Sequence, residues 1–212
     1  MIKQNKGKLI LTSIAIMIPV AIGLFLWKDL PDTIATHWGF NGQPDGYSSK
    51  VFAVFGLPLL LLAVHWFCVF ATKLDPKHKD INPKMFSIVL WICPAISIVM
   101  NTLVYLIALG KEIRFVSGVI IFMGLLFIII GNYLPKCRQS YTMGIKFPWT
   151  LNDEENWNKT HRMAGVLWVI GGIVICATAI FESFIIFFSI MALMMIVPTV
   201  YSYMYYKKTI KK

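Results

Sequence analysis

The polar residues between positions 28 and 50 include groups that could bind a metal or move a proton. His37 stands there with Asp32 and Asp45, and imidazole with carboxylates is a common ligand set for divalent metals. No regular helical spacing unites the three residues, and the other histidines are scattered along the chain. The sequence also contains no G-x-S-x-G, H-E-x-x-H or Gly-rich phosphate-loop motif. We therefore expect no catalytic activity, no metal and no other cofactor.

Two polar side chains, His65 and Asn101, stand deep inside long apolar runs. Ionisable groups within a membrane are costly and often serve ion or proton coupling. The apolar runs of this chain contain no Asp, Glu, Lys or Arg, and Glu182 falls at a turn between two of them. A neutral His65 hydrogen-bonded to a neighbouring helix, and an Asn101 that joins two helices, account for these residues. The pattern therefore disfavours a coupled transporter.

The four cysteines are Cys68, Cys93, Cys137 and Cys176. Three of them lie in apolar runs, and no pair has the spacing of a metal site or suggests a disulfide. Cys137 alone lies in a polar stretch. We expect small core residues plus one exposed thiol, that of Cys137.

The polar stretch at 135–162 has the pattern of a helix start. Thr150 is suited to cap a helix whose first turn holds three carboxylates, because a hydroxyl satisfies orphan N–H groups and negative charge complements the helix dipole. Those carboxylates are Asp153, Glu154 and Glu155.

The same helix predicts a shared face for Trp157, His161 and Gly165, which follow one another at intervals of four residues and run into the next apolar stretch. Trp149 and Trp157 fall near the level of lipid headgroups, where tryptophan is favoured. The pattern is that of an interfacial anchor helix or of a recognition surface, and the residues alone leave both open.

The stretch at 28–50 combines turn residues with apolar ones. Asn41-Gly42 and Pro44-Asp45-Gly46 are typical of turns. Between Pro31 and these turns the stretch is unusually apolar for an exposed loop. We expect an ordered lid that folds back onto the mouth of the helix bundle, through Ile34, His37, Trp38 and Phe40.

Six long apolar stretches must position these polar segments. The 212 residues are 58% hydrophobic and only 14% charged, whereas soluble domains carry about 25% charged residues. Crossing a hydrocarbon core of ~30 Å takes about 20 apolar residues, and six stretches qualify: 9–27, 51–71, 85–109, 115–134, 163–181 and 184–206. Runs of this length cross lipid as helices, and a bundle tolerates as kinks the prolines they contain, namely Pro19, Pro58, Pro94 and Pro198. The sequence predicts an all-α polytopic membrane protein with six transmembrane helices.

The basic residues predict the orientation of these helices. Four segments on one side of the alternation hold 16 of the 20 basic residues, and such a bias marks the cytoplasmic side. An even number of spans then places both termini in the cytoplasm, an N-in/C-in topology. The group comprises Lys3, Lys6, Lys8, Lys73, Lys77, Lys79, Lys84, Lys136, Arg138, Lys146, Lys159, Arg162, Lys207, Lys208, Lys211 and Lys212, against Lys28, Lys50, Lys111 and Arg114 on the other side.

Both polar stretches carry a family resemblance. The segment 144–151, which reads GIKFPWTL, with the Trp-x-x-x-His pair that follows it, resembles the signature of the SdpI-type immunity family. That family consists of bacterial multi-pass proteins named for immunity to a secreted sporulation-delaying toxin. The stretch 30–50 is similar to the small N-terminal domain of unknown function that often accompanies the family.

This resemblance implies a division into residues 1–84, with the outer loop 28–50, and residues 85–212, with the inner loop 135–162. It also implies which residues recognise a ligand or partner. In the inner loop these are Gly144, Pro148, Trp149, Thr150, Trp157, His161 and Arg162, and in the outer loop Pro31, His37, Trp38, Gly42 and Asp45.

The function that the resemblance implies is that of a receptor in the bacterial cytoplasmic membrane. Such a protein protects its cell by binding a secreted antimicrobial peptide toxin, and it holds a small cytoplasmic transcriptional repressor at the membrane without touching nucleic acid itself. The lipid bilayer is a further partner. Two alternatives stay open, namely a transporter or exporter of small hydrophobic compounds and an orphan membrane scaffold.

Overall fold

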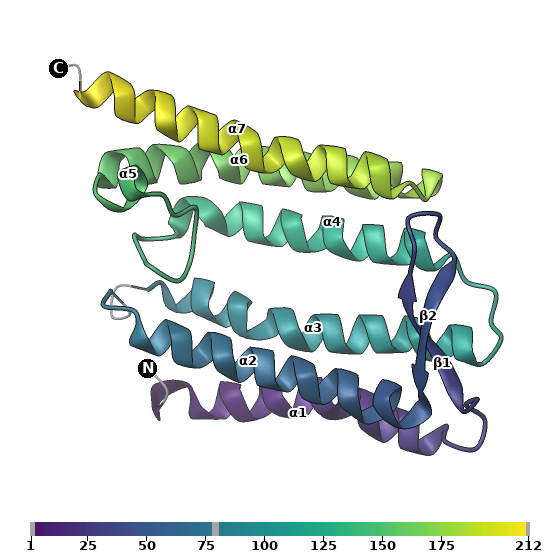
Figure 1. Ribbon diagram of the computed structural model, residues 1–212. Helices are drawn as coiled ribbons and strands as arrows, with labels where there is room; N and C mark the ends of the chain where they lie inside the picture. Colours follow the sequence, from purple (N-terminus) through teal and green to yellow (C-terminus); the bar gives the residue numbers. More distant parts are fainter. Residues whose placement is uncertain (1–2, 78–80, 211–212) are drawn as a thin grey trace.

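A computed structural model describes residues 3–77 and 81–210 of the chain, so His78, Lys79, Lys211 and Lys212 lie outside the described residues. Six long helices run side by side, and the two ends of the chain lie at the same end of the bundle (Figure 1). The helices are α1 (Lys6–Phe25), α2 (Leu57–Leu74), α3 (Pro83–Ala108), α4 (Phe115–Tyr133), α6 (Glu154–Thr178) and α7 (Phe184–Ile210). Each is long and apolar enough to cross a membrane, which confirms the six predicted spans.

The boundaries of two helices differ from the prediction. The fifth long helix begins at Glu154 rather than at 163, so the inner loop's helix and the fifth span are one continuous element. A π-helical turn, Phe52–Gly56, runs directly into α2, so Pro58 lies inside one continuous helical span, Phe52–Leu74, as predicted. Proline has no N–H for the regular helical hydrogen bonds, and the irregular turn directly precedes it.

The helices form two groups. The first bundle consists of α1, α2 and α3, and the second of α4, α6 and α7. In the first, Ser97 of α3 donates a hydrogen bond to the carbonyl of Ile16 at 2.8 Å, and the hydroxyl of Tyr105 donates to the carbonyl of Pro19 at 3.1 Å. These hydroxyls supply donors around the proline of α1, as expected of a bundle that accommodates kinks.

The predicted hydrogen bond from His65 to a neighbouring helix is present. Its Nε2 lies 3.1 Å from Oγ1 of Thr12 on α1, and the Thr12 hydroxyl already donates to the carbonyl of Lys8. His65 is therefore the donor to this hydroxyl. Asn101 differs from the prediction, because its amide donates to the carbonyl of Ser97 on its own helix instead of joining two helices.

Glycines set the contact between α4 and α6 in the second bundle. Gly124 faces Gly172 so closely that a Cβ on either would lie within 2.8 Å of the other's carbonyl oxygen, and Gly131 faces Gly165 in the same way, within 3.0 Å. Small residues let two helix backbones approach within a membrane. The two glycines of each helix are seven residues apart, and this spacing keeps them on the same side of the helix.

The outer loop is a β-hairpin, which corrects the all-α prediction. Strand β1 (Thr33–Trp38) pairs antiparallel with β2 (Pro44–Ser49), from Thr33 opposite Ser49 to Trp38 opposite Pro44. Of the predicted turn residues, Asn41 and Gly42 lie in the connection, where Gly42 has a φ of 76°, whereas Pro44, Asp45 and Gly46 belong to β2. Glycine adopts that conformation without strain. Sequence reasoning found the turn but not the strands, because only β1 is rich in β-branched residues.

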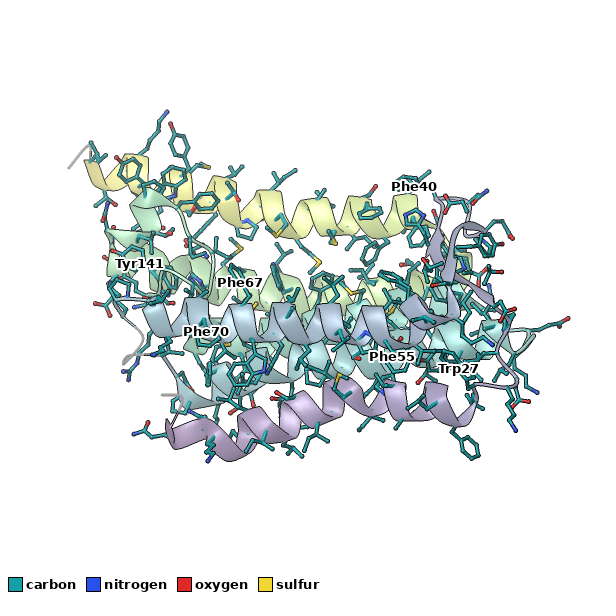
Figure 2. All side chains as sticks on the ribbon, turned by 60° about the horizontal axis from the view of Figure 1, so that its bottom comes forward. Trp27, Phe40, Phe55, Phe67, Phe70 and Tyr141 are labelled. Carbon is teal, nitrogen blue, oxygen red and sulfur yellow. The ribbon has the colours of Figure 1, made fainter. Side chains whose placement is uncertain are left out.

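The hairpin is an ordered lid that contacts both bundles, as predicted, although two of the residues expected to fold back, His37 and Phe40, are largely exposed. Ile34 is buried in a cluster with Val54 and Tyr105 of the first bundle. Trp38 stacks on Phe115 of α4 with ring centroids 3.7 Å apart. Phe40, whose ring centroid is 6.4 Å from that of Phe184 on α7, lies near the end of that helix (Figure 2). We call this the hairpin end of the molecule, and the opposite end, with both termini, the terminal end.

Candidate functional site

Asp75, directly after α2, organises the inner loop at the terminal end. The residue is buried, and its Oδ2 accepts four hydrogen bonds: from the hydroxyls of Ser140 and Thr142 at 2.6 and 2.8 Å, and from the backbone N–H groups of Tyr141 and Thr142 at 2.9 and 3.0 Å. Oδ1 accepts a fifth, from the N–H of Lys77 at 2.8 Å. A chain segment of the second half is thereby fixed to the end of α2.

Burial alone would raise the pKa of the Asp75 carboxyl, but the hydrogen bonds from Ser140, Lys77 and Thr142 outweigh it and hold the pKa below its ordinary value. Asp75 was not singled out from the sequence, because the lysines around it are typical of a solvent-exposed connection. The available signal was one carboxylate in an otherwise basic connection, placed at the end of an apolar run.

Gly144 lies directly against the predicted helix face. It has a φ of 103°, and a Cβ there would stand 2.5 Å from Nε2 of His161 and 2.8 Å from the ring of Trp157. Both the conformation and the space require glycine at this position. The family signature therefore begins with a residue on which the contact between loop and helix depends.

His161 uses both ring nitrogens inside the protein. Its Nδ1 lies 2.8 Å from the carbonyl oxygen of Trp157, which can only accept, and its Nε2 receives the N–H of Ile145 at 2.9 Å. These partners define a neutral imidazole with the proton on Nδ1. With neither nitrogen available, His161 holds the loop in this conformation and is not placed to bind a metal.

Trp157 is fully buried between the two bundles. Its indole N–H donates to the carbonyl of Cys137 at 2.7 Å, and its ring stacks on His161 with centroids 4.0 Å apart. The ring belongs to a cluster that includes Leu9 of α1 and Phe86 of α3. Trp157, His161 and Gly165 do share one buried face of α6, as predicted, but that face points inward.

Thr150 does not cap the long helix. It lies in the short helix α5 (Pro148–Leu151), where its hydroxyl donates to the carbonyl of Ile145 at 3.0 Å and receives the N–H of Phe147 at 2.9 Å. The cap of α6 is Asp153, whose side chain accepts the N–H of Asn156 at 3.0 Å. The carboxylates at the start of α6 were predicted correctly, but one of them performs the capping assigned to Thr150.

The remaining signature residues lie near α7 or on the surface. The half-buried Trp149 donates its indole N–H to the hydroxyl of Ser202 at 3.0 Å, and its ring stacks on Phe147. Pro148 and Arg162 are exposed. The signature thus consists of a buried part that fixes the loop and a smaller part that a partner can reach.

Cys137 is buried, so the predicted exposed thiol is wrong. Burial raises the pKa of this thiol to about 11 and hides it from reagents. Cys137 is buried because it packs in the same cluster as Trp157. Cys68, which lies in an apolar run, is the exposed cysteine instead.

The outer-loop candidates come together only in part. Nδ1 of His37 lies 2.5 Å from Oδ1 of Asp45 across the hairpin, and both side chains are exposed. Asp32 instead pairs with Lys50 at 3.4 Å, so the sequence trio does not form one site. Of the other motif members, Gly42 approaches α4 closely, whereas Pro31 is exposed ahead of β1. Within the described residues no group of three His, Cys, Asp or Glu side chains is placed to hold a metal.

These features define a multi-pass helical membrane protein with an ordered hairpin at one end and a hydrogen-bonded loop at the other. Residues 136–202 match the SdpI/YfhL protein family, and residues 14–62 match a domain of unknown function, DUF1648. The chain thus resembles the SdpI/YfhL family over this C-terminal segment and the second domain over a segment nearer its N-terminus.

A similar protein is "Immunity protein SdpI" from Bacillus subtilis (strain 168). The two sequences are 28% identical over 208 residues, which cover 95% of this chain and 97% of the relative. No solved structure matches the chain. The resemblance noted from the inner-loop and outer-loop motifs is confirmed.

Proposed function

We propose that this chain is an immunity protein of the bacterial cytoplasmic membrane that binds an extracellular antimicrobial peptide and so protects its cell. One observation carries the proposal: the likeness to an immunity protein runs along nearly the whole length of both chains. An activity that needed only part of the fold would not require such extended similarity. The protein acts as a receptor and not as an enzyme.

The hairpin end faces outward in this proposal, and the terminal end faces the cytoplasm. The excess of basic residues at the terminal end supports this N-in/C-in orientation. The hairpin is then available to a secreted peptide. The inner loop is available to a small cytoplasmic transcriptional repressor, which the protein holds at the membrane once the toxin is bound.

Within the inner loop, recognition of the repressor falls to the exposed residues Pro148 and Arg162 and to the half-buried Trp149. The buried residues of the signature act indirectly, because Gly144, Thr150 and His161 fix the conformation in which the loop is presented. We also propose the division into residues 1–84 and 85–212. This division follows the chain and not the packing, because α3, the first helix of the second part, lies against α1 and α2.

A challenge assay tests the proposal. The chain is expressed in a toxin-sensitive Gram-positive host, and survival is measured with increasing amounts of the purified sporulation-delaying toxin for which the family is named. We expect survival at concentrations that kill cells carrying an empty vector. Equal killing of both, with the protein shown to be present in the membrane, would contradict the proposal.

A second arm separates immunity from export. The described spans contain no carboxylate that would suit proton coupling at depth, so tolerance should persist when the proton gradient is collapsed at unchanged expression. Tolerance that disappears with the gradient would favour the transporter alternative.

A further inference from the structure

A cavity lies between the two bundles, directly beneath the hairpin. Its volume is about 360 Å³, within the range of about 300–1,000 Å³ that small-ligand sites occupy. Trp38 of the hairpin covers one side, and side chains from α2, α3, α4 and α7 form the others. The cavity is therefore built by both bundles and by the element that joins them at this end.

Asn101 is the polar residue that the helices contribute to this mostly apolar wall, and Thr36 and His37 of the hairpin also line it. Asn101 is 2% exposed, and its amide nitrogen donates to Ser97. Its Oδ1 is buried and accepts no hydrogen bond from any described residue. A buried acceptor without a donor is costly in a protein interior, so an occupant that supplies an N–H or O–H would be stabilised there.

The position of the cavity restricts where its occupant comes from. Asn101 lies seven residues before the end of α3, which places it about 10 Å below that end at 1.5 Å per residue. Leu60 of α2 also lines the cavity, although 58% of that residue is exposed on the face of a membrane-spanning helix. An occupant can thus enter from the surrounding lipid layer and need not cross the hairpin.

The chemistry of the wall distinguishes between two kinds of apolar occupant. A lipid acyl chain fits the apolar surface but has no donor for Asn101. A peptide segment brings apolar side chains together with N–H groups, and the first turn of a helix leaves four of those N–H groups unpaired. Asn101 therefore favours a peptide over an acyl chain.

We propose that the cavity beneath the hairpin is the binding site for an apolar segment of the toxin, with Oδ1 of Asn101 accepting a hydrogen bond from a toxin N–H group. This inference rests on the proposed immunity function and adds the location of the site and the residue that selects a peptide. The toxin reaches the site after it has entered the outer part of the membrane.

Two substitutions test the site in the challenge assay with the purified sporulation-delaying toxin. Asn101→Leu removes the acceptor at nearly constant volume, and Val119→Trp fills the cavity from α4. Ile121→Trp adds the same ring two residues further on, at a side chain that is exposed outside the cavity. We expect both Asn101→Leu and Val119→Trp to lower the toxin concentration that the cells survive by about tenfold or more. For Asn101→Leu this is the change expected for losing one buried hydrogen bond. Ile121→Trp should protect like the unaltered protein.

A cross-linking measurement keeps the test independent of how well each variant folds. A photoreactive benzoylphenylalanine replaces Leu60, at the cavity, or Leu59, which is also exposed on α2 but does not line it. In membranes, added toxin should cross-link from position 60 and not from position 59.

The outcomes separate the two proposals. Lack of protection by the unaltered protein would overturn the immunity function and this inference with it. Protection that all three variants retain, or toxin cross-linked equally from both positions, would overturn the binding site alone. Cross-links from position 60 to phospholipid that added toxin does not displace would assign the cavity to acyl chains.

Discussion

At the scale of single residues, the family signature describes a folded loop more than an exposed surface. Gly144 lies where no side chain fits, His161 has both ring nitrogens occupied, and Trp157 is fully buried. The sequence indicated that these residues belong together. It could not show which way the helix face points, because a membrane protein places apolar residues both inside and against lipid.

Gly144 and Gly110 form a matched pair that separates backbone strain from lack of space. Both have positive φ, 103° and 73°, but a Cβ at Gly110 would meet nothing within 4 Å. Gly110→Ala should therefore cost roughly 1–2 kcal/mol of stability, the penalty for a left-handed conformation. Gly144→Ala should cost clearly more, because it also displaces His161. Thermal unfolding in detergent measures both, and equal losses would show that contact with His161 is unimportant.

Asp75 predicts a pH dependence of stability. Because its folded-state pKa is lowered, its ionised form contributes stability above the ordinary carboxyl pKa, about 3.9, and the contribution is lost as the pH falls through the lower folded-state pKa. Asp75→Asn should be less stable than the unaltered protein at pH 7, and the difference should shrink below about pH 4. Glu112→Gln, at an exposed site in the other end of the molecule, serves as the control and should show no such convergence. A difference for Asp75→Asn that stays constant down to pH 3 would contradict the role of its charge.

At the scale of elements, the apolar runs predicted the helices well but not the contacts between them. The long helices follow from run length alone, whereas the facing glycines of α4 and α6 become evident only when both helices are placed. The hairpin was missed for a different reason. Its β2 strand contains Pro44, Asp45 and Gly46, which disfavour strand structure locally. Pairing with β1 at the hairpin end overrides that preference.

The close approach of α4 and α6 predicts a strong difference between two neighbouring positions. Gly172→Leu should destabilise the second bundle and reduce the amount of folded protein, because the new side chain meets the backbone carbonyl of Gly124 at the position of its first carbon. Ile173→Leu alters an exposed side chain of similar size on the same helix and should have little effect, within about 0.5 kcal/mol. Size-exclusion profiles of the solubilised variants report the result. Normal profiles for Gly172→Leu would show that the helices separate without cost.

At the scale of the whole molecule, two three-helix bundles are joined at their two ends by different means. The hairpin joins them through apolar contacts with Tyr105 and Phe115, and at the opposite end Asp75 joins them through hydrogen bonds to the inner loop. The cavity that Asn101 lines lies between the bundles at the hairpin end. A ligand that entered there would contact both bundles and the hairpin.

A secreted peptide can reach the hairpin only if the hairpin end faces outward, and cysteine labelling in intact cells measures this orientation directly. Cys137 is unsuitable because it is buried, so single cysteines are introduced at Asn41, exposed on the hairpin, and at Asn158, exposed on the first turns of α6 at the terminal end. A membrane-impermeant thiol reagent should label Asn41→Cys in intact cells and Asn158→Cys only after permeabilisation. Labelling of Asn158→Cys from outside, with Asn41→Cys protected until the cells are opened, would reverse the orientation and contradict the account.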